Sequence, residues 1–365
     1  MDNSFKALGL MSGTSMDGID ASIILSDGLD NLEVIDNQYF KYPKKFKDDL
    51  SSFINNIFDQ KDIEQNINLF RSLERQITFY HSEISEKIIK DNNCEIQLIG
   101  FHGQTIVHKP QNGYSVQMGD ANLLSQILKK KVVNKFRDND IKNGGEGAPL
   151  TPIYHKLLSK KINLKKPILF LNIGGVANFT YCNQNKLYAK DIGPGNVLID
   201  EYLKKVKGTY YDEDGIIASH GKINRNIINH FYEHEFYGIK KKRSYDRKEF
   251  DFSFVRGLEF EDAVSTLTYF TALTISKNIR NNITNDFELI LCGGGRKNLT
   301  LVNHIKDLLD QKIYIIDEFG FDGDFIESQA FAYLSIRSYI NQPLSYPDTT
   351  NVKHPCNGGL IRKNY

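Results

Sequence analysis

The sequence predicts an α/β fold of two lobes around a central cleft, and three observations support that prediction. Apolar runs of strand length, starting near Phe5, Ile96, Pro167 and Phe287, each end in a glycine-rich polar loop. Continuously apolar runs are typical of strands buried on both faces of α/β sheets. Segments of helical periodicity lie between them, and a length of 365 residues favours two domains. Because the strand-and-loop modules recur, we expect two related halves facing a cleft, where ligands commonly bind.

Helical periodicity is clearest in residues 65–90, where apolar side chains recur every three or four residues and predict one buried helix face. Residues 263–278 and 326–339 have the same pattern. Charge, glycine and proline replace this periodicity in residues 129–152, which we interpret as the lobe boundary. We therefore expect residues 1–130 with 345–365 to form the N-terminal lobe, and residues 131–344 the C-terminal lobe.

Composition excludes several classes of protein. Lys and Arg number 46 against 45 Asp and Glu, and no long block has one sign, which argues against a nucleic-acid or membrane partner. Cys94, Cys182, Cys292 and Cys356 are widely spaced, so we expect neither a disulfide framework nor a zinc site. No apolar run approaches the roughly 18 residues of a membrane span, and no signal peptide is evident. We expect a soluble, cytoplasmic protein.

The first glycine loop, GTSMDG at residues 13–18, joins two strands. A Walker loop or a dinucleotide loop would open a helix, whereas apolar and polar residues alternate after Gly18 with the period of a strand. The loop therefore belongs to a hairpin. Glycine backbone amides and Ser and Thr hydroxyls can surround a phosphate, and the loop resembles those that hold ATP in acetate kinases, sugar kinases, actin and heat-shock chaperones. An ordinary tight hairpin is the alternative.

Two later glycine loops favour a nucleotide site. NIGGVAN at residues 172–178 can supply a second set of backbone donors from the other lobe. CGGGRKN at residues 292–298 ends a strand, and three consecutive glycines permit the close approach of a flat ring such as adenosine. Each loop alone also fits a plain turn. The predicted ATP-binding residues are Gly13, Thr14, Ser15, Met16, Asp17, Gly18, Ile19, Asp20, Asn172, Gly174, Gly175, Gly293, Gly294, Gly295 and Asn298.

Asp191 is the candidate catalytic residue. It precedes Gly193, Pro194 and a predicted helix at residues 197–204, whose free N–H groups can face an anion. A carboxylate at the entrance of a phosphate site can deprotonate a nucleophile. The alternative is that Asp191 is a helix cap or a turn residue.

Eight stretches of the chain, in one order from Gly9 to Leu334, resemble the anhydro-N-acetylmuramic acid kinase family. They are GLMSGTSMDGID, GFHGQT with His108 beyond it, QMGD, FRDNDIKNGGEGAPLTPIYH, LNIGGVANFT, DIGPGNVLID, LCGGGRKN and FIESQAFAYL. The resemblance implies a two-lobed, actin-like ATPase fold of the ribonuclease H-like type. It also implies a bacterial enzyme of peptidoglycan recycling that converts 1,6-anhydro-N-acetylmuramic acid, ATP and water into N-acetylmuramic acid 6-phosphate and ADP.

The same resemblance implies roles for individual residues. Asp191 would activate a water that attacks C1, while the departing O6 takes the γ-phosphoryl group of ATP. Mg²⁺ would offset the charge of the phosphates through Asp17 or Asp20 and intervening waters. The residues expected at the sugar are His102, Gln104, Arg137 and Glu327. The segment with Ser244, Asp246 and Arg247 resembles a family segment near the cleft. The family also suggests a homodimer.

Three residues depart from the family pattern. Lys135 stands where the family has Asp, Glu146 where Gln is common, and Asn351 where Gly is expected. Asn tolerates a left-handed backbone, so we expect the turn at Asn351 to survive. Two other functions stay open at this point: another sugar or carboxylate kinase of the same superfamily, and a nucleotide-dependent binding protein without enzymatic activity.

Overall fold

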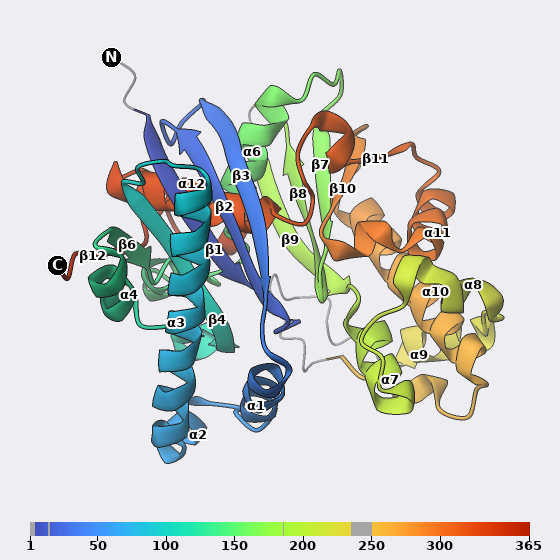
Figure 1. Ribbon diagram of the computed structural model, residues 1–365. Helices are drawn as coiled ribbons and strands as arrows, with labels where there is room; N and C mark the ends of the chain where they lie inside the picture. Colours follow the sequence, from blue (N-terminus) through green and yellow to red (C-terminus); the bar gives the residue numbers. More distant parts are fainter. Residues whose placement is uncertain (1–3, 14, 185, 235–249) are drawn as a thin grey trace. The chain divides into compact units, whose positions relative to one another are not determined.

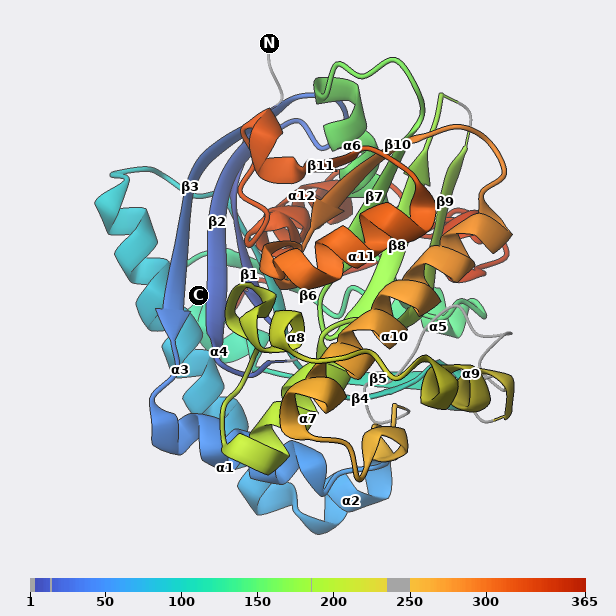
Figure 2. The same ribbon diagram turned by 90° about the vertical axis from the view of Figure 1, so that its right-hand side faces the viewer.

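The computed structural model describes residues 4–13, 15–184, 186–234 and 250–365. The chain forms two compact units, the first from Met1–Lys161 with Phe325–Tyr365 and the second from Ile162–Asp324 (Figures 1 and 2). The second unit is thus one continuous segment inserted into the first. Thr14 and the segment with Ser244, Asp246 and Arg247 lie outside the described residues.

A seven-stranded sheet forms the first unit in the order β12-β6-β4-β1-β2-β3, with β5 paired to β4. β1, β2 and β3 are antiparallel neighbours, whereas β4 is parallel to β1 and β6 is parallel to β4. Its elements are β1 (Phe5–Ser12), β2 (Gly18–Ser26), β3 (Leu32–Lys41), α1 (Lys44–Asn55), α2 (Gln60–Gln65), α3 (Ile67–Asp91), β4 (Leu98–Lys109), η1 (Pro110–Asn112), β5 (Tyr114–Met118), α4 (Ala121–Leu128), β6 (Lys131–Asn134), α5 (Asp138–Lys142), α6 (Pro152–Lys161), α12 (Ile326–Tyr339), α13 (Pro347–Thr350) and β12 (Leu360–Arg362).

Helices cover both faces of this sheet. Leu8 and Leu10 of β1 share a core with Ile77 and Ile84 of α3. Gly9 points to the opposite face, because successive residues of a strand alternate. A Cβ atom on Gly9 would lie 1.9 Å from a backbone oxygen of α12, so glycine is what allows that helix to pack so closely.

The second unit contains a five-stranded sheet in the order β11-β10-β7-β8-β9. β7, β8 and β9 are antiparallel neighbours, and β10 and β11 are parallel to β7 and β10 respectively. Its elements are β7 (Ile168–Ile173), β8 (Val176–Cys182), β9 (Leu187–Pro194), α7 (Val197–Lys207), η2 (Glu213–Gly215), α8 (Ile216–His220), α9 (Arg225–His234), η5 (Ser253–Val255), α10 (Phe260–Asn282), β10 (Glu288–Cys292), η6 (Gly294–Lys297), α11 (Leu299–Leu309), β11 (Ile313–Ile315) and η7 (Ile316–Phe319).

The two units share one strand order. In each, the first three strands form an antiparallel meander that two parallel strands extend from the first strand: β4 and β6 in the first unit, β10 and β11 in the second. The first unit has β5 in addition, antiparallel to β4. In the second unit, α10 and α11 pack on the sheet through Ile275, Ile279, Leu301 and Ile305 (Figure 2). This repeat matches the prediction of two related halves.

The units divide at different residues from those expected in the sequence. The segment after residue 130 continues the first unit, because β6 pairs with β4 and β12 pairs with β6. The segment before residue 345 also belongs to it, because α12 packs on β1, β2 and β4. The unit boundaries thus depend on contacts between residues far apart in the sequence.

Local predictions were closer to the structure. The helix expected at residues 326–339 is α12, and the one at residues 65–90 is α3 with α2 before it. The prediction of a glycine loop at GFHGQT is wrong. β4 continues through Gly103, whose φ is +72°, and the residues after Gly103 pair with β5.

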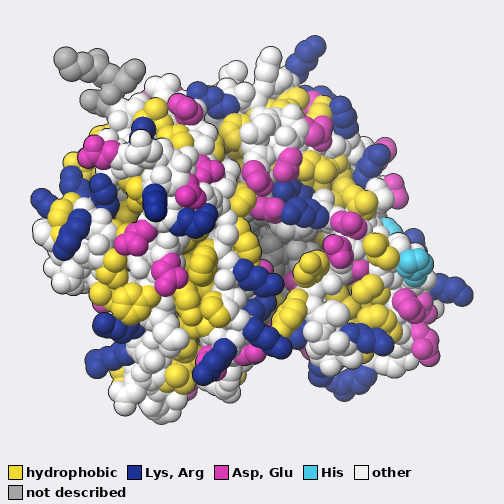
Figure 3. All heavy atoms as spheres, in the orientation of Figure 1, with side chains coloured by type: hydrophobic (Ala, Val, Ile, Leu, Met, Phe, Trp, Pro, Cys, Tyr) yellow, Lys and Arg dark blue, Asp and Glu magenta, His cyan; other side chains and the backbone are white. Residues whose placement is uncertain are grey.

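None of the helices in the described ranges combines the length and apolar character that a membrane span requires. On the face shown in Figure 3, Lys and Arg side chains are interspersed with Asp and Glu, in keeping with a net charge of +1.

Candidate active site

The predicted phosphate hairpin is present in the first unit. β1 and β2 pair from Phe5↔Ser26 to Met11↔Asp20 and leave residues 13–17 as the connection. Met16 has a φ of +55°, a conformation that costs a non-glycine residue energy, and its side chain is buried in the core. Met16 therefore offers a ligand its backbone only.

Buried side chains beneath the hairpin hold its carbonyl groups. Gln104 is 1% exposed; its Nε2 donates to the Gly13 carbonyl at 3.1 Å, and its Oε1 lies 2.8 Å from Ser12 Oγ. Ser12 Oγ also lies 3.1 Å from the Gly18 carbonyl, and the Tyr42 N–H donates to the Asp17 carbonyl. Carbonyl oxygens repel phosphate, so engaging three of them inside the unit suits an anion-binding loop.

Asp17 and Asp20, the predicted magnesium residues, are half-buried on this hairpin. Burial, and then the charges of these two carboxylates, raise the pKa of Tyr39, which stands opposite Asp20 in the sheet. The negative charges of Asp17 and Asp20 therefore both reach the surroundings of the Tyr39 hydroxyl. Among the residues that the structure describes, no group of three or more His, Cys, Asp or Glu side chains could hold a metal ion.

A polar row crosses the sheet of the second unit. Asn172 of β7 pairs with Asn178 of β8, which pairs in turn with Asp191 of β9. Residues directly opposite one another share a face of the sheet, so these three side chains lie on one side. The predicted ATP residue Asn172 and the predicted base Asp191 are thus on one face of the sheet, two strands apart with Asn178 between them. Asp191 is 7% exposed.

Some of the N–H groups at the start of α7, which the sequence predicted to be free, bind the β7–β8 turn instead. The N–H groups of Gly195 and Val197 donate to the Gly175 carbonyl, and that of Asn196 donates to Gly174. A Cβ atom on Gly195 would lie 2.2 Å from the Gly174 oxygen. These first N–H groups tie the helix to the β7–β8 turn, and α7 continues to Lys207 rather than Lys204.

The three consecutive glycines have different environments. A Cβ atom on Gly293 would lie 2.3 Å from Asn172 Oδ1, and one on Gly295 would lie 2.3 Å from Ile173 Cγ2. Both glycines therefore let this turn pack on the end of β7. Only at Gly294 would a Cβ atom find nothing within 4 Å, which leaves it as the glycine that a ring can approach. Asn298 Oδ1 accepts from the Leu301 N–H and caps α11.

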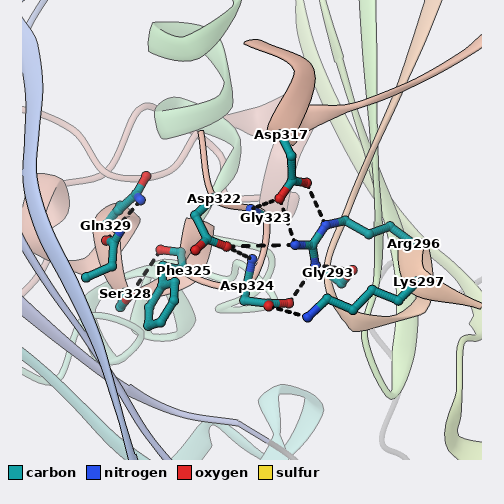
Figure 4. A network of polar contacts seen from close by, with 11 residues as sticks. Gly293, Arg296, Lys297, Asp317, Asp322, Gly323, Asp324, Phe325, Ser328 and Gln329 are labelled. Atoms are coloured by element: carbon teal, nitrogen blue, oxygen red, sulfur yellow. Dashed lines mark hydrogen bonds and ion pairs between the residues drawn. The ribbon is translucent and has the colours of Figure 1, made fainter. Parts of the chain in front are cut away.

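The Arg296 side chain holds this glycine turn in place through hydrogen bonds and ion pairs (Figure 4). Its side chain is 4% exposed, and Nε and Nη2 donate to the Asp317 carboxylate at 2.7 and 2.9 Å. Nη1 donates to Asp324 Oδ1 at 2.6 Å and to the Gly293 carbonyl at 3.2 Å. Burial opposes ionisation of Asp317 and Asp324, but their bonds to Arg296 prevail and hold the pKa of each below its ordinary value.

His102 and Arg137, two of the predicted sugar residues, contact each other in the first unit. The His102 ring is 5% exposed, and its Nε2 accepts from Arg137 Nη2 at 2.9 Å. Its Nδ1 donates to the Gly103 carbonyl at 2.7 Å. Burial, and then the Arg137 charge, hold the pKa of His102 well below its ordinary value, so the ring is neutral. Arg137 Nη1 also donates to the Gly147 carbonyl.

The loop that carries Gly147 depends on Asp140. This buried carboxylate accepts from the Gly147 N–H, Ser345 Oγ and Thr350 Oγ1 at 2.5 to 2.6 Å. It therefore ties the loop beside Arg137 to the C-terminal segment.

Two of the departures from the family pattern contact each other. Asn351 Nδ2 donates to Glu146 Oε1 at 2.7 Å, and Asn351 has the left-handed φ of +63° that was expected. Lys135, the third expected departure, forms a partly exposed ion pair with Asp138 at 3.5 Å. Glu327 lies half-buried in the first turn of α12, where a negative charge is favourable.

Sequence reasoning missed Ser12, Tyr42, Asp140, Asn178 and Arg296. The acidic run DEFGFDGDF at residues 317–325 was a signal for a buried cation nearby. The other four depend on pairings between distant strands and loops, for which a single sequence has no local signal.

Two units of one strand order, each with a glycine turn between its first two strands, place the chain in the class of proteins with the actin-like, ribonuclease H-like fold. Sugar kinases belong to this class. A family model described as anhydro-N-acetylmuramic acid kinase matches residues 5–364, and the chain belongs to that family. It is therefore a sugar kinase, acting on anhydro-N-acetylmuramic acid in peptidoglycan recycling.

Curated relatives match over their full length. Anhydro-N-acetylmuramic acid kinase of Pelagibacter ubique is 48% identical, with 100% of both chains covered. That of Zymomonas mobilis is 36% identical over 97% of this chain and 99% of its own. Among solved structures, component A of (R)-2-hydroxyglutaryl-CoA dehydratase from Acidaminococcus fermentans aligns with 92% of this chain at a TM-score of 0.48 and 8% identity.

Proposed function

We propose that Asp191 is the general base of a reaction in which water opens the 1,6-anhydro bridge and O6 takes the γ-phosphoryl group of ATP. The observation that supports this role is the polar row of Asn172, Asn178 and Asp191 beside the Gly174–Gly175 turn. It gathers a buried carboxylate and polar amides next to backbone that can face a phosphate.

The substrate itself explains the need for a base. O6 is bonded to C1 in the anhydro sugar, so no free hydroxyl is available there for phosphorylation. Asp191 takes a proton from water, the water oxygen bonds to C1, and the C1–O6 bond breaks. O6 then bonds to the γ-phosphorus while ADP leaves, so one carboxylate serves both hydrolysis and transfer.

Turnover in oxygen-18 water tests this order of bonds. We expect the label in the C1 hydroxyl of the product and none in its phosphate, measured by mass spectrometry of the intact and dephosphorylated sugar. Label in the phosphate would mean that water attacks phosphorus, and would contradict the proposal.

We propose that ATP is held by three turns. In the first unit, residues 13–20 are the proposed phosphate-binding residues. In the second unit, Gly174–Gly175 are proposed for the phosphates and Gly294 for the adenosine. The inward carbonyl groups of the first hairpin and the open side of Gly294 support these assignments.

Asp17 and Asp20 are the residues proposed to hold Mg²⁺ through water. Mg²⁺ commonly takes one or two protein carboxylates and completes its shell with waters and substrate phosphates. Two neighbouring carboxylates on a phosphate hairpin fit that donor set. When bound, the ion offsets the charge of the phosphates.

We propose that Arg137 binds the lactyl carboxylate of the sugar, with His102 positioning the guanidinium and Glu327 binding a sugar hydroxyl. The planar fork of Arg suits a carboxylate, and a neutral His102 adds no competing charge. For Gln104 we propose a different role from the one first expected. Both ends of its amide already hold the hairpin, so it positions the phosphate loop.

We also propose that the protein is a cytoplasmic homodimer, as the family resemblance implies. Light scattering coupled to gel filtration tests the oligomeric state, and a mass of one chain at micromolar concentration would contradict it.

A further inference from the structure

We propose that Asn178 holds the attacking water together with Asp191. This inference rests on the proposed role of Asp191 and adds a second residue that binds the reacting atoms. Asn178 lies in the middle of the polar row, and the NIGGVAN pattern had suggested backbone donors there without a role for its side chain.

The sheet register places the two side chains side by side. Asn178 and Asp191 are directly opposite one another on β8 and β9. Opposed residues have Cβ atoms about 4.5–5.5 Å apart and share a face of the sheet. Carboxylate and amide heads at that spacing can both reach one water molecule, which needs two to four polar partners.

The Asn178 side chain has an acceptor left over. Its Oδ1 atom is buried, and no residue in the described part of the chain donates a hydrogen bond to it. A buried acceptor without a partner is destabilising, so a site that keeps one commonly receives water or ligand there. One water proton can go to Asn178 Oδ1 and the other to Asp191, which leaves an oxygen lone pair to attack C1.

A β-bulge in β9 lies directly after Asp191. The register shifts between Ala177 and Asn178, so that Ile192 is an extra residue on β9 immediately after Asp191, and Gly193 has a φ of +131°. Such bulges re-aim side chains and are frequent beside active sites. The bulge separates the paired Asn178–Asp191 position from the turn at the end of the sheet.

The substitution Asn178→Leu tests whether Asn178 binds the attacking water or has only a structural role. Leu has nearly the shape of Asn but no acceptor, so removing the unpaired oxygen leaves the melting temperature unchanged or higher. We expect kcat to fall about 100-fold, because the water loses its orientation, while KM for ATP and for the sugar stay within about twofold. A merely structural asparagine would show the reverse: a lower melting temperature and nearly normal kcat.

Two further variants sharpen the result. Asn178→Thr keeps an accepting oxygen on the strand, and we expect it to restore part of the lost kcat. Asn183→Leu removes an asparagine just beyond the far end of β8, where its Oδ1 accepts from the Lys186 N–H. We expect this control to leave kcat unchanged.

The outcomes also separate this inference from the proposed function. If Asp191→Asn is inactive but Asn178→Leu retains normal kcat, the role of Asn178 is wrong and that of Asp191 stands. If Asp191→Asn is active, the proposed base is wrong and the inference about Asn178 falls with it.

Discussion

Asp191 lies in a strand interior, where a carboxylate is uncommon, and two asparagines continue its line across the sheet. Neither asparagine can neutralise it by charge, and both can hydrogen-bond water or phosphate. Its surroundings therefore suit a base whose proton comes from a bound molecule.

We predict that Asp191→Asn folds and binds ADP normally but loses turnover by about 10²- to 10⁴-fold, as the removal of a general base should. Steady-state kinetics with calorimetric ADP titration measure the two effects separately. Turnover within threefold of the wild type would remove Asp191 from the proposed role.

Gly294 and Gly295 form a matched pair for testing the adenosine turn. At Gly294 a Cβ atom meets nothing, so Gly294→Val should keep the melting temperature and raise KM for ATP at least tenfold. At Gly295 a Cβ atom would collide with Ile173, so Gly295→Ala should lower the melting temperature by several degrees. Normal ATP kinetics in Gly294→Val would place the adenosine elsewhere.

At the scale of the element, Arg296 holds the glycine turn through Asp317, Asp324 and the Gly293 carbonyl. Lys keeps the charge of Arg296 but cannot span three partners. We predict that Arg296→Lys raises KM for ATP more than fivefold and leaves KM for the sugar within twofold.

Lys297→Met is the control for Arg296→Lys, because the exposed Lys297 pairs with Asp324 alone. It should change neither constant, since exposed ion pairs contribute little. Equal effects of the two substitutions would mean that charge, and not the span of Arg296, supports the turn.

The turn at Asn351 shows how a residue other than glycine can occupy a left-handed backbone position. Asn351→Ala should cost about 1–2 kcal/mol of unfolding free energy, because alanine disfavours a φ of +63° and the bond to Glu146 is lost. Asn351→Gly keeps the backbone free and should stay within about 1 kcal/mol of the wild type. Urea titrations measure both, and equal losses would show that backbone strain is not the cause.

Much of the element structure was predictable because it has local causes. An apolar run predicts a strand, and three-residue spacing predicted α12 to the residue. The role of Gln104 was not predictable, because it depends on β4 lying beside β1 so that Gln104 stands opposite Ser12. Arg296 likewise finds Asp317 and Asp324 only after β11 returns the chain to the glycine turn.

At the scale of the whole molecule, buried neutral histidines link stability to pH. Burial lowers the pKa of His81 to about 4 and that of His155 to about 3, below the ordinary 6.5. The unfolded chain therefore binds more protons than the folded one as pH falls from 6.5 towards 4. Stability is fully present above 6.5 and is lost through this window at roughly 1.4 kcal/mol per pH unit for each histidine.

We predict that the urea midpoint falls between pH 7 and pH 5, and that His81→Leu makes this fall shallower. A pH-independent midpoint in the wild type would contradict the neutral state of the buried rings.

The shared strand order has a consequence for ancestry. Duplication and fusion of one ancestral gene accounts for two meanders that each continue into two parallel strands. The paralogous halves then place the Gly13–Asp17 connection and the Gly174–Gly175 connection at equivalent points, between first and second strand. The two turns proposed to bind ATP thus descend from one primordial turn, and the carboxylate proposed as the base belongs to the second copy.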